Sequence, residues 1–232
     1  MTLPLHTTVP LDYYLLLRPS DGRPEGLVVE EFSVREDGTA SGLDTAGWTV
    51  DTGGWWSSAD FGAALRADPD LRGRLRPVHR EGAETAYRML GGGVLDEEAV
   101  LRLNFLDHRR LPNSAPLSLF DGPEPGSRVY RILLAGEADP PGLAELCAAW
   151  QLRPVDAALD PLGRVVGRTQ GTAGRHDLAW ELRRIGAGLG WAVDVTVRLH
   201  DGPADPVPAA LYELRQEARA CGLLPVTVER FA

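Results

Sequence analysis

The polar residues best suited to chemistry lie between positions 164 and 181. The group comprises two arginines, a short polar tripeptide and one acid: Arg164, Arg168, Arg175, His176, Asp177 and Glu181. A histidine beside acidic groups can act as a general base, and arginines bind anions. If strands over 164–169 and 177–185 pair, these side chains converge on one site. The alternative is a solvated loop followed by an ordinary charged strand, because adjacent strand residues point to opposite faces.

Asp194 is a second catalytic candidate, because it interrupts the apolar run from Trp191 to Val197. Burial would raise the pKa of its carboxyl group unless an arginine pairs with it. The alternative is that the face bearing Asp194, Thr196 and Arg198 is exposed to water, as one face of an antiparallel sheet often is.

Trp55 and Trp56 follow Gly53 and Gly54, which predicts two indoles in a glycine-flanked loop. Consecutive side chains of an extended segment point in opposite directions, so one indole is expected to be exposed. Exposed tryptophans are enriched at binding hot spots, which makes this loop a candidate protein-binding surface. The alternative is that both indoles fill gaps between the two units of the chain.

Patterns typical of metal and cofactor sites are missing from the sequence. The five histidines form no HxH or HExxH motif and no pairing with cysteine. There is no GxSxG motif, and a GxxxxGK[ST] phosphate loop is excluded because the chain has no lysine. The glycines at 91–93 fit a helix end better than a phosphate loop. We therefore predict neither a metal nor a cofactor.

Composition predicts a globular protein of the cytoplasm. Apolar residues make up 44% of the 232 residues and charged residues 25%, which is enough for a core. No apolar run approaches the roughly 18 residues of a membrane span, and residues 1–6 lack the features of a secretory signal. Cys147 and Cys221 each sit in an apolar, helix-like run, so we expect buried, reduced thiols.

Charge is divided unevenly along the chain. Residues 1–126 carry 20 acids and 12 bases, a balance of −8, whereas residues 127–232 carry 13 acids and 12 bases, a balance of −1. Such a chain repels nucleic acid and favours a protein partner, a basic one among the options. All 24 basic residues are arginine. Either a GC-rich coding genome or avoidance of lysine-directed modification accounts for this bias.

Turn-forming residues at 121–126 place a boundary near residue 125, between an acidic α+β unit over 1–125 and a second unit over 126–232. In the first unit we expect strands over 13–17 and 27–34, a hairpin into 39–51, helices over 58–67 and 81–90, and a helix from 96. Ala99, Leu103 and Leu106 would form the buried stripe of that last helix.

The second unit is predicted to follow the order β-α-β-β-β-α-β. Its strands are expected over 129–135, 164–169, 178–185, 191–199 and 224–231, and its helices over 139–150 and 208–220. The 178–185 segment also fits a helix. This order predicts a ferredoxin-like split βαβ fold with one extra strand, with the strand at 190–199 central.

Two functional hypotheses follow from these patterns. The first is a non-catalytic binding or regulatory protein, for example an immunity-type inhibitor or an adaptor, which would act through its acidic unit and the Trp55–Trp56 loop. The second is a small-molecule enzyme or ligand sensor that holds an anionic ligand on Arg164, Arg168 and His176. A third hypothesis is that the protein is a structural subunit.

Overall fold

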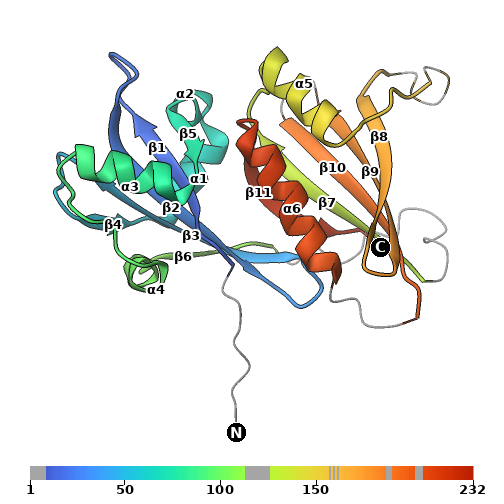
Figure 1. Ribbon diagram of the computed structural model, residues 1–232, viewed down its shortest axis with the longest axis horizontal. Helices are drawn as coiled ribbons and strands as arrows, with labels where there is room; N and C mark the ends of the chain where they lie inside the picture. The colour runs from blue at the N-terminus through green and yellow to red at the C-terminus, as the bar shows by residue number, and fades with distance from the viewer. Residues whose placement is uncertain are drawn as a thin grey trace, which may run out of the picture. The chain divides into compact units, whose positions relative to one another are not determined.

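The computed structural model describes residues 9–112, 126–156, 158, 160, 162–186, 190–201 and 206–231. Contacts divide the chain into two compact units: Met1–Phe32, Leu43–Gly62 and Arg74–Arg109 in the first, and Ser33–Gly42, Ala63–Gly73 and Arg110–Ala232 in the second. By this division, the second unit begins at Arg110 and also takes two earlier segments, Ser33–Gly42 and Ala63–Gly73. The fold is mixed, with two sheets and more strand than helix (Figure 1).

The first sheet has six strands in the order β4-β3-β2-β1-β5, and β6 pairs with β3. The strands are β1 (Asp12–Leu17), β2 (Pro24–Val34), β3 (Ala40–Thr49), β4 (Trp55–Ser57), β5 (Leu75–Val78) and β6 (His108–Arg110). β1 is antiparallel to both β2 and β5. The hairpin predicted at 36–38 is confirmed, since Gly38 adopts a positive φ of 88° between β2 and β3.

The helices of this part of the chain are α1 (Ala59–Ala67), α2 (Pro69–Arg72), α3 (Arg80–Met89), α4 (Glu98–Leu101) and a 3-10 turn, η1 (Arg102–Asn104). The Ser58 hydroxyl accepts a hydrogen bond of 3.0 Å from the Phe61 amide, which caps α1 as the sequence predicts. α3 buries Ala83 and Tyr87, four residues apart, in a core that also contains Tyr13, Val29 and Trp48.

The prediction that Ala99, Leu103 and Leu106 form the buried stripe of a helix from residue 96 is wrong. Leu103 and Leu106 are 74% and 84% exposed, whereas Leu101 is completely buried. The prediction assumed regular α-helical spacing from residue 96. The α-helix instead begins at Glu98, lasts one turn and tightens into η1, which changes the residues that face inward.

Trp55 and Trp56 lie in β4 and not in a loop, and both are half-buried. The Trp55 ring stacks on Tyr87, with ring centroids 6.0 Å apart. The Trp56 ring contacts Phe61 edge to face at 4.9 Å and occupies the space beside Gly47, where a Cβ atom would lie 2.2 Å from the indole. The two indoles therefore pack on different neighbours, and the expected exposed indole is not found.

The second sheet has five antiparallel strands in the order β11-β7-β10-β9-β8. They are β7 (Ser127–Ala135), β8 (Val165–Ala173), β9 (His176–Ile185), β10 (Gly190–Arg198) and β11 (Leu224–Arg230). The predicted central strand is confirmed as β10, and the 178–185 segment is a strand. β8 and β9 join through Gly174 and Arg175, with a positive φ of 59° at Gly174, as a tight hairpin requires.

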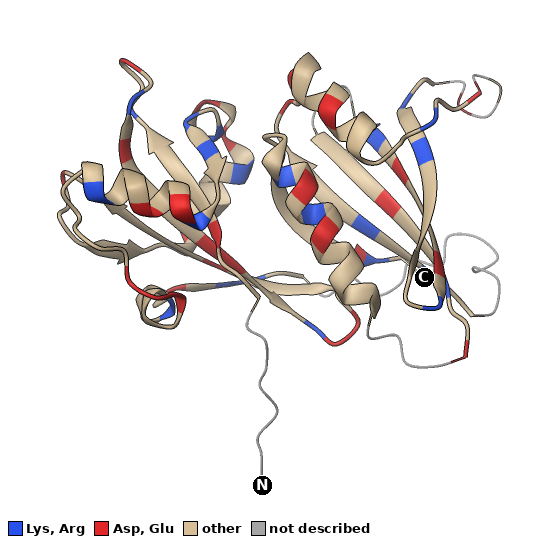
Figure 2. Ribbon diagram, in the orientation of Figure 1, with Lys and Arg blue, Asp and Glu red and all other residues tan. Residues whose placement is uncertain are grey.

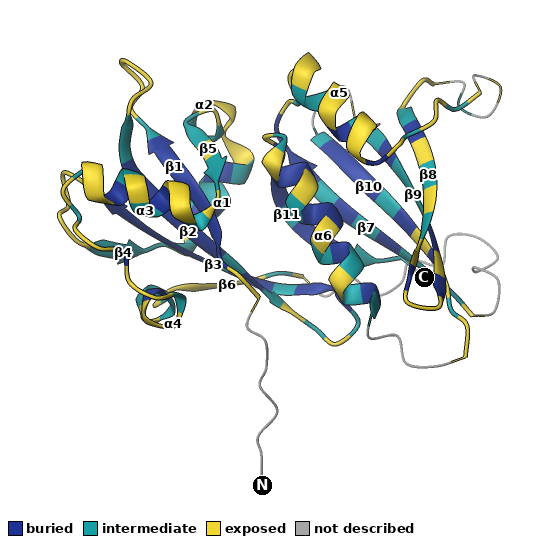
Figure 3. Ribbon diagram, viewed as in Figure 1, coloured by how far each residue is buried: buried dark blue, intermediate teal, exposed yellow. Residues whose placement is uncertain are grey.

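Alternate residues of β10 give the second sheet two different faces. Val193, Val195 and Val197 are completely buried, and α5 (Pro140–Ala149) and α6 (Pro206–Ala220) lie over one face of the sheet (Figures 1 and 3). α6 contributes Leu211, Leu214 and Ala218 to this core, as predicted. The charged and polar residues between the valines are therefore placed on the opposite face.

Within the described residues, no helix combines the length and apolar character needed to cross a membrane.

We predict that truncating either indole of β4 destabilises the fold. Trp55→Ala and Trp56→Ala should each lower the free energy of unfolding by about 2–3 kcal/mol, somewhat less than for a completely buried tryptophan. Gly47→Ala should be destabilising in the parent chain and much less so in the Trp56→Ala background, because the clash is removed. Urea unfolding of the single and double variants measures both effects. Parent-like midpoints for both tryptophan variants would contradict the packing described.

Cys147 and Cys221 are half-buried, not fully buried, and burial raises the pKa of each thiol. A raised pKa means that fewer thiolates form at any given pH, and the thiolate is the reactive species. We predict slow alkylation by iodoacetamide of the native protein at mildly alkaline pH, faster alkylation as pH rises further, and rapid alkylation in urea. Mass spectrometry at timed points measures the rates, and equal rates in native and unfolded protein would contradict the prediction.

Candidate functional site

A row of charged residues crosses the second sheet on the face opposite α5 and α6. The strand register places one charged residue from each strand next to the following one: Glu229, Arg131, Asp194, Glu181 and Arg168. Figure 2 shows basic and acidic positions side by side on neighbouring strands of this sheet. Because cross-strand neighbours lie about 5 Å apart, these side chains are close enough to interact directly.

The row forms a connected chain of ion pairs. Arg131 binds Asp194 through two hydrogen bonds, from Nε at 2.5 Å and from Nη2 at 2.7 Å. Arg183 Nη1 lies 3.2 Å from Asp194 Oδ2 and 3.8 Å from Glu181 Oε1. Arg168 Nε donates to Glu181 Oε2 at 2.7 Å. Arg183 therefore bridges two adjacent acids that would otherwise repel each other.

The electrostatics at the Arg131 end follow from this pairing. The hydrogen bonds that the Arg131 guanidinium donates to Asp194 raise its pKa, and the same guanidinium packs over the Phe231 ring at 4.5 Å. Asp194 is only 15% exposed, so its carboxylate is held mainly by arginines and not by water. Both of its oxygens accept hydrogen bonds from guanidinium groups. The arrangement fits a structural ion pair better than a catalytic acid or base.

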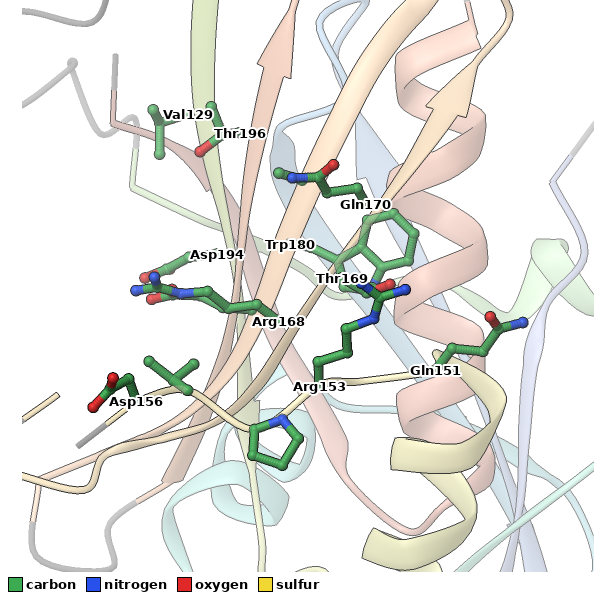
Figure 4. A pocket seen from close by; sticks show the side chains of 14 residues that line it. Val129, Gln151, Arg153, Asp156, Arg168, Thr169, Gln170, Trp180, Asp194 and Thr196 are labelled. Carbon is green, nitrogen blue, oxygen red and sulfur yellow. The ribbon is translucent and has the colours of Figure 1, made fainter. Parts of the chain in front are cut away.

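A hollow of about 800 Å³ lies beside this row. Its lining includes Arg168, Gln170, Asp194 and Thr196 from the sheet and the segment from Gln151 to Asp156 from the chain after α5 (Figure 4). The volume lies within the range of small-molecule sites. In the described part of the chain, the lining contains neither histidine nor cysteine. No group of histidine, cysteine and acidic residues that could hold a metal ion occurs among the described residues.

The backbone of Arg153 is held beside the hollow by an isolated β-bridge to Arg168. The Arg153 amide donates to the Arg168 carbonyl at 2.8 Å, and the Arg168 amide donates back at 2.9 Å. Arg168 is neutralised by Glu181, whereas the Arg153 side chain is exposed and makes no hydrogen bond or ion pair with any described residue. Among the described residues of the lining, Arg153 is therefore a cation without an ion-pair partner, and Asp156 is an acid without one.

Trp180 supplies a second unused donor. Its indole Nε1 is buried without a hydrogen-bond partner among the described residues, and the ring lines the hollow. Figure 4 shows the Trp180 ring and the Arg153 guanidinium on the same side of the hollow, beside Thr169. An unsatisfied buried N–H group costs about 1–3 kcal/mol. Indole and guanidinium are both donors only; Gln151, Thr169 and Gln170, which line the same part of the hollow, carry acceptor oxygens, but none of them accepts from the Trp180 indole.

Comparisons of the chain with protein-family models, curated proteins and solved structures give no match. What the hollow can bind is therefore inferred from its own donors, acceptors and charges.

The group of polar residues predicted between 164 and 181 does not converge. His176 is completely buried, and its Nδ1 accepts a hydrogen bond of 3.1 Å from the His200 amide. Asp177 lies on the opposite face of β9, where it contacts His200 Nε2 at 2.8 Å. Arg175 sits in the hairpin turn and donates to the Asp201 carbonyl at 2.6 Å. The alternation of β9 separates these residues, as the competing interpretation of the sequence held.

Of the predicted site residues, Arg168, Glu181 and Asp194 line the hollow, while Arg164 precedes β8 and is exposed outside it. Trp55 and Trp56 belong to the first sheet. Sequence reasoning missed Arg153 and the indole of Trp180. Arg153 follows a helix in an irregular segment, and Trp180 occupies an apolar position of a strand, so neither has a motif that would have singled it out.

We predict that Asp194 matters for stability. Asp194→Ala leaves Arg131 and Arg183 without their shared acceptor, which should lower the free energy of unfolding by about 2 kcal/mol, less than for a fully buried pair. Thr196→Ala, on the same face of β10, is the matched control and should change stability by less than about 0.5 kcal/mol. Urea unfolding measures the free energy of unfolding of each variant. High salt should reduce the difference between Asp194→Ala and the parent chain, because salt screens the ion pairs. Equal urea midpoints for Asp194→Ala and the parent chain would show that the ion-pair row contributes nothing to stability.

Proposed function

We propose that this protein is a non-catalytic binding protein whose second unit takes a small organic anion in the hollow beside Arg153 and Trp180. The observation that carries the proposal is the Arg153 guanidinium, which is exposed in the lining of the hollow and has no ion-pair partner among the described residues. The buried Trp180 indole N–H, which lacks an acceptor among those residues, lies beside it. A carboxylate or phosphate group supplies acceptor oxygens and the opposite charge together.

Two of the three acids in the described lining of the hollow are paired with arginines. Glu181 is neutralised by Arg168 and Arg183, and Asp194 is bound by Arg131 and Arg183. The third acid, Asp156, accepts a hydrogen bond from the Ala158 amide. Because Arg168 is paired with Glu181, the Arg153 guanidinium is the cation of the lining that is left for an anion.

The apolar part of the lining indicates the rest of the ligand. Val129, Val155 and Ala179 line the hollow together with the Trp180 ring. A ligand that buries an apolar or aromatic body there gains roughly 25 cal/mol per Å² of apolar surface removed from water. We therefore propose a carboxylate or phosphate attached to a small apolar body.

The same geometry supports binding over catalysis. A general base needs a carboxylate or imidazole within reach of the ligand and free to accept a proton. In the described lining there is no imidazole, and Asp194 and Glu181 are held by arginines. The third carboxylate, Asp156, accepts a hydrogen bond from the Ala158 amide. The sequence-based hypothesis of an enzyme that uses His176 loses its support, because this residue is buried away from Arg168.

We also propose that the second unit has a ferredoxin-like fold with β8 as the extra strand. β10 and β11 are both antiparallel to β7, so they run in the same direction on either side of it, and α6 connects them. If β8 is set aside, the remaining elements follow the order β-α-β-β-α-β of that fold. This order supports the assignment.

Binding can be tested by following the indole N–H signals in ¹H–¹⁵N spectra during titration with phenyl phosphate and with inorganic phosphate. The chain has six tryptophans, and the signal of Trp180 is the one missing in Trp180→Phe. We predict that this signal moves downfield on binding, that phenyl phosphate binds more tightly than phosphate, and that Arg153→Ala weakens binding at least about tenfold.

Arg164→Ala is the matched control, because Arg164 is equally exposed in the same unit but lies outside the lining. It should leave the affinity unchanged, and sodium chloride at equal ionic strength should not move the Trp180 signal. A Trp180 signal that stays fixed throughout the phenyl phosphate titration, or that moves equally in Arg153→Ala, would refute the proposed site.

A further inference from the structure

A second pocket adjoins the hollow in the same unit. Its volume is about 300 Å³, and it is lined by the end of α5, by β8 and β9, and by one face of α6, so we call it the α6 pocket. Four side chains line both spaces: Gln151, Thr169, Gln170 and Trp180. A ligand held in the hollow can therefore extend past these side chains into the α6 pocket.

The charge of the α6 pocket is opposite to that of the Arg153 guanidinium. Its described lining contains two acids, Glu213 and Glu217, and no basic residue. The two acids are four residues apart on α6, a spacing at which like charges repel each other. Glu213 is exposed and makes no hydrogen bond or ion pair with a described residue. Unlike Glu181 and Asp194 in the hollow, these carboxylates have no arginine to neutralise them.

Glu217 is held in place by the indole of Trp150. Trp150 is buried at the end of α5, and its Nε1 donates a hydrogen bond to Glu217 Oε2. An indole N–H carries no charge, so the carboxylate remains negative while its position is fixed. No described residue donates to the other oxygen, Oε1. A positively charged donor that enters the pocket therefore meets an acceptor that is already oriented.

The Trp180 ring forms a wall that the hollow and the α6 pocket share. The ring packs against Gly171, where a Cβ atom would lie 3.1 Å from two of its carbons, so a side chain at this position would crowd the indole. The face of an indole attracts cations, whereas its N–H group binds acceptors. One aromatic ring can therefore interact with both charged groups of a ligand that spans the two spaces.

We propose that the ligand of this protein is a small zwitterion, with its carboxylate or phosphate at Arg153 and a primary ammonium group at Glu213 and Glu217. This inference rests on the proposed function, because the anionic group is the one that the hollow takes. An ammonium group supplies three N–H donors and a positive charge, which complement the two carboxylates of the α6 pocket. An anion that lacks the ammonium group leaves these carboxylates unpaired and is repelled by them.

The ammonium group can be tested with two matched compounds, tyramine phosphate and para-propylphenyl phosphate, in which a methyl group replaces the ammonium. We expect tyramine phosphate to bind about fivefold more tightly, as measured by titration calorimetry of the full chain. Glu213→Gln should remove most of this preference without weakening the binding of para-propylphenyl phosphate. Glu145→Gln is the matched control, because Glu145 is an exposed acid of the same unit outside both linings. It removes the same charge and should keep the preference.

A second variant guards against a local effect of the first. In Glu217→Gln the amide oxygen can still accept from Trp150, so the contact between α5 and α6 is kept while the charge is lost. This variant should also reduce the preference for tyramine phosphate, and circular dichroism checks that each variant is folded.

The outcomes separate this inference from the proposed function. If neither compound moves the Trp180 indole signal, the proposed function and the inference fail together. If both compounds move the signal and bind equally tightly, the anion site stands and the zwitterion is overturned. A preference for tyramine phosphate that survives in both Glu213→Gln and Glu217→Gln would likewise overturn the placement of the ammonium group.

Discussion

The register between β7 and β10 couples the two faces of the second sheet. Placing Val193 and Val195 in the core beneath α6 requires that Asp194 project from the other face, directly opposite Arg131. A slip of one residue would move the valines into water and the carboxylate into the core, so apolar burial and ion pairing favour the same register. Arg183 then has to lie near Asp194 and Glu181, because two adjacent carboxylates without a cation would repel each other.

The pairing within the row decides which charge is left for a ligand. Asp194 and Glu181 are both neutralised by arginines, so of the three acids in the described lining Asp156 is the one that still opposes an anion. Arg168 is satisfied in the same way, which leaves Arg153 as the cation of the hollow without a described partner. The ligand preference of the site thus depends on ion pairs that lie beside it, and weakening the row at Asp194 would change the field at Arg153 as well as the stability of the sheet.

Local patterns predicted the elements well where burial alternates strictly. The alternation of Val193, Val195 and Val197 identified the central strand, and the helical spacing of Leu211 and Leu214 identified α6. The site was much less predictable. Arg153 reaches the hollow only because an irregular segment forms a single bridge to β8, and the lack of an acceptor at Trp180 depends on side chains from several elements. Contacts of this kind depend on tertiary packing, which leaves no periodic signal in the sequence.

Internal pairing leaves a few polar groups of the hollow unsatisfied, and these groups set the ligand that it can take. The Arg153 guanidinium and the Trp180 indole N–H have no partner among the described residues, so an acceptor with negative charge complements them. The uncharged side chains of Gln151, Thr169 and Gln170 in the same lining can both donate and accept. Salt should therefore weaken the attraction of an anion to Arg153 strongly, whereas the apolar contacts with Val129, Val155 and Ala179 are not screened.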